Sequence, residues 1–119
     1  MGHVKVTIKI ANPARRDEPI EIPDARVDTG ATFTTIPRAI AEQLNLEVLG
    51  QQKTRTAAGD IVIDRSFAFQ EIAGHDAVLP VWISDTYPGV LVGVFTLEGM
   101  ALAVNPKTGR LVDSELLLL

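Results

Sequence analysis

The sequence contains no cysteine, and this absence excludes disulfide bonds, thiolate nucleophiles and cysteine-ligated zinc sites. It also lacks an excess of positive charge, because 11 Lys and Arg face 15 Asp and Glu, for a formal net charge of −4. A nucleic-acid partner is therefore not expected, since phosphate binding needs a clustered basic surface. No apolar run approaches the roughly 18 residues of a membrane span, and the first residues alternate where a signal peptide would be continuously apolar. We expect no membrane partner and a cytoplasmic location.

The length of 119 residues and the mass of 12.8 kDa predict one domain that covers residues 1–119. Hydrophobic residues make up 46% and charged residues 22%, which is typical of an ordinary globular protein. A chain of this size buries roughly 65% of its unfolded surface, which is enough for a single core. No linker, internal repeat or low-complexity segment divides the sequence.

Short β-prone segments between turn residues dominate the chain. Val4, Val6, Ile8 and Ile10 alternate with polar residues, which predicts a half-buried strand over residues 3–10. The other expected strands are residues 20–27 (interrupted at 23–24), 31–35, 47–50, 52–57, 61–72, 77–83, 90–92, 101–104 and 110–112.

One segment has helical spacing. Pro37 suits a first helical turn, and Ile36, Ala39, Ile40 and Leu44 follow a helical period up to residue 45. A further turn of helix is expected at residues 95–99. Many short strands around one or two short helices predict a mainly β fold, with a mainly antiparallel sheet that is closed or sandwich-like.

Most kinds of catalytic site have no support in the sequence. The serines Ser66, Ser84 and Ser114 lie in no nucleophile elbow, and only His3 and His75 are available as a triad base. Two isolated histidines do not form a zinc motif, and His75, between Gly and Asp, is interpreted as an exposed turn residue. No phosphate-binding glycine loop is present. We therefore expect neither a metal nor an organic cofactor.

The remaining feature is an acid at the end of an apolar strand, at Asp28-Thr29-Gly30. Taken alone, this triplet is typical of a turn, because Asp accepts hydrogen bonds from nearby amides and Gly supplies positive φ. It occurs once in the chain. An enzyme that needs two such acids would therefore need two chains.

The context of this triplet resembles the retroviral-type (retropepsin-like) aspartic proteases. The residues that carry the resemblance are Val27-Asp28-Thr29-Gly30-Ala31-Thr32, a hairpin of small residues at 56–62, and Val90-Leu91-Val92-Gly93. They occur in the order that the family shows. The resemblance as a whole spans about residues 4–112, and a closing segment at 103–111 supports it. Where the sequence departs from the retroviral pattern, it is closer to the cellular, non-viral branch of the family. The resemblance implies a β-rich half-barrel that forms a homodimer, in which each chain gives one Asp to a shared active site beneath two hairpin flaps.

The resemblance also implies a role for each residue of the triplet. Asp28 is the catalytic acid and base, and Thr29 braces the loop by a hydrogen bond across the dimer axis. Gly30 permits a close backbone approach, and Ala31 keeps the wall beside the substrate small. This assignment makes Asp28, Thr29 and Gly30 the catalytic set.

Substrate-binding positions follow from the same resemblance. Ala57, Ala58 and Gly59 form the flap tip, where small residues let two flaps meet over an extended peptide. Pro88 and Val90 line the pockets for substrate side chains, although Val90 in an apolar strand is equally typical of a core position. The expected partners are a second copy of the chain and an extended peptide or protein substrate.

The chemistry of this route requires the dimer. Peptide hydrolysis needs two carboxylates that share one proton, one to accept a proton from water and the other to polarise the scissile carbonyl. Each chain supplies one such acid. A two-fold axis between two copies of Asp28 brings these groups together by symmetry.

Two departures from the family pattern concern the dimer and the flap. Retroviral members have an acid and an arginine where this chain has Thr32 and Val94, so the ion pair that steadies their dimer is missing. The flap tip has one glycine where retroviral flaps have several. We expect a dimer that lacks this bond and a lid that is stiffer or differently shaped.

Two apolar features remain. Trp82 is interpreted as a core or interface anchor, with a pocket wall as the alternative. The chain finishes with four leucines, for which we weigh a place in the dimer interface against disorder or docking on the same chain: Leu116, Leu117, Leu118 and Leu119.

The sequence thus predicts an aspartic endopeptidase in which two Asp28 carboxylates activate a water. An alternative is a dimeric scaffold of the same fold that binds an extended peptide without cutting it. A third hypothesis is a small β-barrel in which Asp28 only caps a turn.

Overall fold

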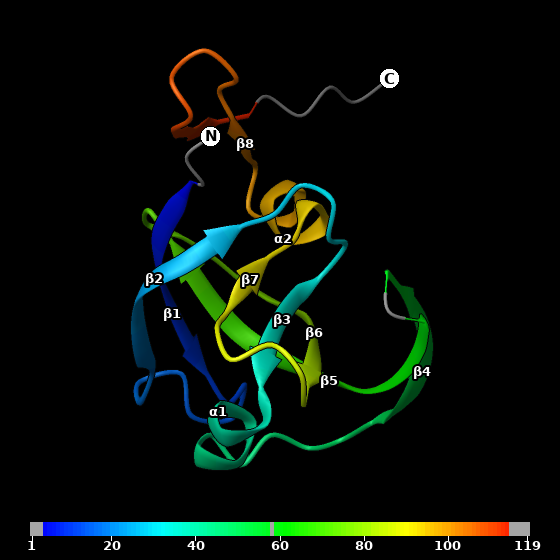
Figure 1. Ribbon diagram of the computed structural model, residues 1–119. Coiled ribbons are helices and arrows are strands. Elements are labelled where there is room, and N and C mark those ends of the chain that lie inside the picture. Colours follow the sequence, from blue (N-terminus) through cyan, green and yellow to red (C-terminus); the bar gives the residue numbers. More distant parts are fainter. Residues whose placement is uncertain (1–3, 58, 115–119) are drawn as a thin grey trace, which may run out of the picture.

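The computed structural model describes residues 4–57 and 59–114, shown in Figure 1. This part of the chain is mainly β, as expected, and contains two short helices. The elements are β1 (Lys5–Ala11), β2 (Ile20–Val27), β3 (Thr34–Pro37), α1 (Arg38–Gln43), β4 (Gly50–Thr56), β5 (Gly59–Ile72), β6 (His75–Ser84), β7 (Leu91–Val92), α2 (Val94–Gly99), β8 (Leu102–Val104) and β9 (Leu111–Asp113).

One sheet has the strand order β1-β2-β7-β3-β6-β5-β4, and β1 also pairs with β5. The sheet therefore curls round on itself, with the outer end of the β4–β5 hairpin extending beyond the ring (Figure 1). Most pairings are antiparallel, but β2–β7 and β3–β6 are parallel. Parallel neighbours need long connections. Here the elements from β3 to β6 lie between β2 and β7 in the sequence, and α1, β4 and β5 lie between β3 and β6.

The predicted alternation in β1 is confirmed on the inner face, where Ile8 and Ile10 are fully buried. The predicted interruption of β2 at residues 23–24 is wrong, because β2 is one strand. It contains a bulge instead, since the register with β1 shifts between Val6 and Ile8. Pro23 lacks the amide hydrogen that a regular ladder needs, and a bulge tolerates this.

The core lies inside the ring and is aliphatic. Strands from opposite ends of the sequence contribute to it, and the fully or nearly fully buried side chains include Ile8, Ile10, Ile36, Ile83 and Val92. Each such side chain contributes roughly 1.5–3 kcal/mol through removal of apolar surface from water. The core thus holds β7, which is only two residues long, between β2 and β3.

Several predicted boundaries need correction. The strand expected at residues 47–50 is wrong, because the chain runs as a loop to Leu49, whose N–H donates to Arg65 O at 2.8 Å. The strand expected at 31–35 occupies Thr34–Pro37, since the preceding residues form the loop after β2. Helix α1 begins at Arg38 and ends at Gln43, and the predicted helix at 95–99 is confirmed as α2.

The strands β4 and β5 form a long antiparallel hairpin that ends with the pair Thr56 and Gly59. None of the described residues 50–57 and 59–62 is buried, so the outer half of the hairpin has both faces open to solvent. Gly59 has φ 117°, a conformation that L side chains rarely adopt. This hairpin therefore behaves as an arm attached to the ring through the inner half of β5.

Arg38 connects the base of this arm to the ring. Its guanidinium donates two hydrogen bonds to Asp85, at 2.6 and 2.9 Å, and lies 2.9 Å from Asp64 Oδ2 on β5. The hydrogen bonds from Arg38 lower the pKa of Asp85, and those to Asp85 and Asp64 raise the pKa of Arg38. The start of α1, β5 and the end of β6 are thus joined by one bidentate cation.

The loop after β2 packs against the start of α2 without room for a side chain. A Cβ atom on Gly93 would lie 2.5 Å from the carbonyl carbon and oxygen of Thr32. Next to this contact, the buried hydroxyls of Thr34 and Thr96 are 2.8 Å apart, and the Thr34 N–H donates to Thr96 Oγ1. Gly93 therefore sets how closely α2 approaches the loop that follows Asp28.

No helix in the described ranges is long and apolar enough to cross a membrane. The four leucines at 116–119 lie outside the described residues, so their position stays a prediction.

Gly93→Ala should lower the free energy of unfolding by about 1–3 kcal/mol, because the new methyl group meets backbone that must move. Urea denaturation of both proteins measures this difference. Gly99→Ala is the matched control, since its Cβ would meet only the flexible end of Leu79 and should change stability little. Equal stability of Gly93→Ala and the wild type would show that the close approach is not constraining.

Asp85→Asn should destabilise the protein near neutral pH but not in acid. The pKa of Asp85 is lowered by Arg38 from its ordinary value of 3.8, so its ionised form stabilises the fold above about pH 4. That stabilisation is lost as pH falls through the lowered pKa. Urea midpoints of the two proteins should therefore differ at pH 7 and converge towards pH 2. A difference that persists unchanged in acid would contradict this account.

Candidate active site

Asp28 directly follows β2, and its backbone is fixed by the neighbouring strand. Its N–H donates to Val92 O at 2.9 Å, which continues the parallel pairing of β2 and β7 by one residue. The preceding N–H, of Val27, donates to Val4 O at 2.8 Å. Asp28 is thus held at the end of a strand that is paired on both sides.

The side chain of Asp28 closes a tight turn. The N–H of Gly30 donates to Asp28 Oδ1 at 2.9 Å, and the N–H of Ala31 donates to Asp28 O at 3.0 Å. The turn-capping interaction expected from sequence is therefore present. It uses one carboxylate oxygen, and no described residue of the chain hydrogen-bonds to the other.

The loop from Asp28 to Ala31 reaches the surface. Asp28 is half-buried, whereas Thr29 and Gly30 are exposed. Within the described ranges no residue forms a hydrogen bond with the Thr29 side chain, and no second carboxylate is bonded to Asp28. A Cβ on Gly30 would lie 3.2 Å from Asp28 Oδ1, so a larger residue would press on the carboxylate.

The loop is fastened from its far side by the start of α2. The N–H of Val94 donates to Ala31 O and the N–H of Phe95 donates to Thr32 O, both at 2.8 Å. Thr32 is exposed, and Val94 is 37% exposed. The two positions that depart from the family pattern therefore lie together at the surface and are joined through backbone, with no ion pair between their side chains.

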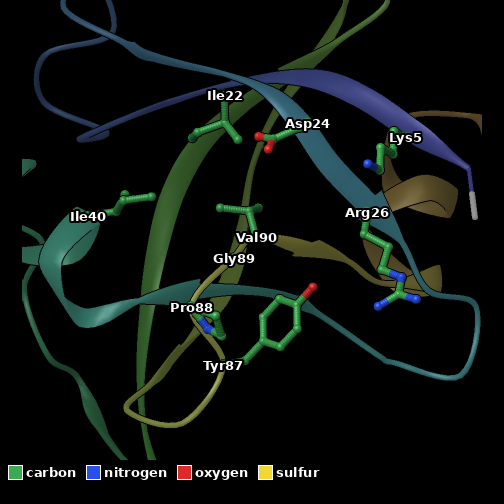
Figure 2. Close-up of a pocket in the computed structure, with 9 residues that line it drawn as sticks. All are labelled: Lys5, Ile22, Asp24, Arg26, Ile40, Tyr87, Pro88, Gly89 and Val90. Atoms are coloured by element: carbon green, nitrogen blue, oxygen red, sulfur yellow. The ribbon is translucent and has the colours of Figure 1, made fainter.

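Pro88 and Val90 border a cavity of about 610 Å³ beside β2 (Figure 2). Val90 is 4% exposed, so it contributes to the core as well as to the cavity wall. The wall segment is held by Ser84, whose Oγ accepts hydrogen bonds from the N–H groups of Thr86 and Tyr87. Both predicted pocket positions therefore face one hollow, whose use by a substrate stays a prediction.

The predicted flap residues are on a different element from Asp28. Ala57 follows β4 and Gly59 begins β5, and both are exposed, whereas Ala58 lies outside the described residues. Figure 1 draws the tip of this hairpin on the same side of the ring as the loop that follows β2. In the single chain the arm leaves the Asp28 loop uncovered, as far as the described residues show.

Trp82 is half-buried and lies outside the buried core cluster, so the expectation of a core position is wrong, whereas a role as an interface anchor stays a prediction. Its ring packs edge-on against Phe33, with ring centroids 5.3 Å apart, and Phe33 packs in turn against Phe95. Phe33 and Trp82 line a second hollow of about 230 Å³ between β3 and the base of the β4–β5 hairpin, together with Leu49 and Phe67. Trp82 therefore forms part of a pocket wall.

The interpretation of His75 as an exposed turn residue also needs correction. His75 begins β6, is half-buried, and its Nε2 lies 2.8 Å from Asp113 Oδ1 on β9. Among the described residues no group of three or more His, Asp or Glu side chains is placed to hold a metal ion. The pair with Asp113 instead connects the β8–β9 hairpin to the sheet.

Three residues of the cavity beside β2 were not assigned a role from the sequence. Lys5, Arg26 and Tyr87 line the cavity of Figure 2 together with Pro88 and Val90. The signal for Arg26 was available, because positions i and i+2 of a strand share a face and Arg26 precedes Asp28 by two. Lys5 and Tyr87 depend on strand register and on the loop after β6, which the sequence pattern does not specify.

No curated protein matches the chain. The family model described as "gag-polyprotein putative aspartyl protease" matches residues 21–98. This range contains the Asp28 turn, the β4–β5 hairpin and the contact of Gly93 with the loop. Since the match covers more than half of the sequence, the chain belongs to this family of retroviral-type aspartyl proteases.

Proposed function

We propose that this protein is an aspartic endopeptidase that acts as a homodimer, with one Asp28 from each chain in a shared active centre. The observation that carries the proposal is the geometry of Asp28. Its carboxylate is oriented by the turn through one oxygen, while the other oxygen has no described partner. Membership of the aspartyl protease family supports the same chemistry.

The proposed reaction requires two carboxylates, and each chain supplies one. In the proposed reaction one Asp28 is ionised and the other is protonated. The ionised group takes a proton from water as the water oxygen attacks the peptide carbonyl carbon, and the protonated group donates a hydrogen bond to the carbonyl oxygen. The tetrahedral intermediate then breaks its C–N bond as a proton passes to the leaving nitrogen. Water is consumed, and an acid and an amine are released.

The exposure of the loop supports the dimer. Thr29 and Gly30 are exposed at the end of a rigid strand, beside a half-buried Asp28. A two-fold axis through this loop would place each residue against its own copy. Two Thr29 hydroxyls would then find the partners that the described part of one chain does not provide.

The β4–β5 hairpin fits the role of a flap. Its outer half buries no described side chain against its own ring, and its strands can offer backbone N–H and C=O groups to an extended peptide. Closure of such an arm over the substrate excludes water from the reacting bond. Arg38 holds the base of the arm, so movement is confined to the part beyond Asp64.

Asp28→Asn should reduce peptide cleavage by about 10²–10⁴-fold or more, because the general base is lost. The fold should persist, since Asn Oδ1 can still accept the hydrogen bond from the Gly30 N–H. The assay is cleavage of a peptide library, with circular dichroism to verify folding. Asp17→Asn, an exposed loop position, serves as the control and should retain full activity.

Retention of cleavage by Asp28→Asn would overturn the assignment of the catalytic acid. If the wild type cleaves no peptide between about pH 3 and pH 8 but still binds peptides as a dimer, the non-catalytic scaffold becomes the better account.

Specific activity should fall on dilution, because dissociation of the dimer separates the two carboxylates. Sedimentation should show a monomer–dimer equilibrium over the same concentration range. Excess Asp28→Asn protein should inhibit the wild type by forming mixed dimers with one carboxylate, whereas excess Asp17→Asn should not. Activity that stays proportional to protein concentration while the monomer predominates would rule out a shared active centre.

A further inference from the structure

The cavity beside β2 contains two positive side chains that face each other across a strand pair. Lys5 on β1 and Arg26 on β2 are direct cross-strand partners, and both line this cavity (Figure 2). Like charges directly opposite each other in a sheet are destabilising. This pair does not stabilise the sheet, and its positive charge borders the cavity.

Neither of these cations forms an ion pair with another residue in ranges 4–57 and 59–114. Three other Lys and Arg residues have acidic partners, namely Arg38, Lys53 and Arg55, whereas most of the exposed ones have none among the described residues. In the described ranges no carboxylate lies within ion-pair distance of Lys5 or Arg26. Arg26 is half-buried and Lys5 is exposed.

One acid, Asp24, lines the same cavity and does not cancel this charge. It makes no ion pair with either cation among the described residues, and Figure 2 draws its carboxylate turned towards Ile22. Figure 2 draws Lys5 and Arg26 on the right, with the Tyr87 hydroxyl near the centre, on the side of its ring that faces Arg26. The cavity thus has a cationic end that includes a neutral hydroxyl donor.

The cationic end is next to Asp28 on the same strand. Arg26 precedes Asp28 by two residues, while the intervening Val27 is buried on the other face. Two residues of a strand span about 7 Å, which is the spacing between side chains on one face of an extended peptide. The N–H of Arg26 donates to Val90 O, one step along the ladder that continues to Asp28 and Val92.

We propose that this cavity binds an acidic side chain, Asp or Glu, of an extended peptide, at a position close to the bond that is cut. The inference deepens the proposed function and rests on it, because it takes the Asp28 face as the place where the peptide lies. Arg26 and Lys5 supply the charge, and the Tyr87 hydroxyl supplies a further hydrogen-bond donor. An acidic residue next to the scissile bond is therefore a determinant of specificity.

The test compares peptides that differ only in one Glu or Gln, scanned through a short extended sequence. Their ends are acetylated and amidated, so that no terminal carboxylate competes for the site. Binding is measured by fluorescence anisotropy on the Asp28→Asn protein, which prevents cleavage. The best Glu peptide should bind roughly tenfold more tightly than its Gln partner. Arg26→Gln and Lys5→Gln, each added to this background, should reduce that ratio, as should high salt.

Charge reversal provides the sharper variant. Arg26→Glu places an acid opposite Lys5, which relieves the like-charge pair, so this variant should fold at least as well as the parent. It should prefer the peptide with Lys at the scanned position over the one with Glu. Arg15→Gln, in the exposed loop between β1 and β2, is the control and should keep the original preference.

Equal affinity for the Glu and Gln peptides, or no binding of either, would overturn the inference. So would a variant at Arg26 that weakens the dimer in sedimentation and leaves the Glu preference intact, because the cations would then serve a contact between copies. Cleavage by the wild type without any preference for Glu would sink this inference and leave the proposed function standing. A preference for Glu in binding, without cleavage of any peptide by the wild type, would support this inference and overturn the proposed function.

Discussion

The hydrogen bond from the N–H of Asp28 to Val92 O is the interaction on which the rest of this site depends. It extends the parallel pairing of β2 with β7 by one residue, so the acid lies at a fixed point where two paired strands end together. The chain then turns through the Asp28 side chain itself. Gly93, which directly follows β7, lets α2 approach the turn from behind. The position of the carboxylate is therefore set mainly by backbone contacts, which depend on glycine at position 93.

This arrangement holds one acid rigidly but does not complete a catalyst. Asp28 has one oxygen committed to the turn, and Thr29 and Gly30 face solvent. The family to which the chain belongs supplies the chemistry that fits such a half-site. In the proposed dimer the two turns are related by symmetry, so the same hydrogen bonds that orient one carboxylate orient both. The hydrogen bonds that fix the turn in each chain would thus also align the two carboxylates in the dimer.

The parts of the fold that follow from local pattern could be predicted, and the parts that depend on long-range register could not. Alternation located β1, and the apolar strand before Asp28 located the acid. The sequence predicted a break where the structure has a bulge at Pro23. A proline, which lacks the amide hydrogen, is compatible with either a bulge or the end of a strand. Lys5 and Arg26 are opposite each other because of that bulge, which shifts the register between β1 and β2 by one residue. No local signal encodes such a shift, so the cationic end of the cavity appears only in three dimensions.

A crystal structure of the protein with a hydroxyl-bearing analogue of an extended peptide tests the central claim most directly. Our account predicts a symmetric dimer in which the two Asp28 carboxylates lie about 3 Å apart and both contact the hydroxyl group. The β4–β5 hairpins of both chains should cover the analogue. A monomer with bound analogue, or a dimer that holds the two Asp28 side chains on opposite sides, would contradict it.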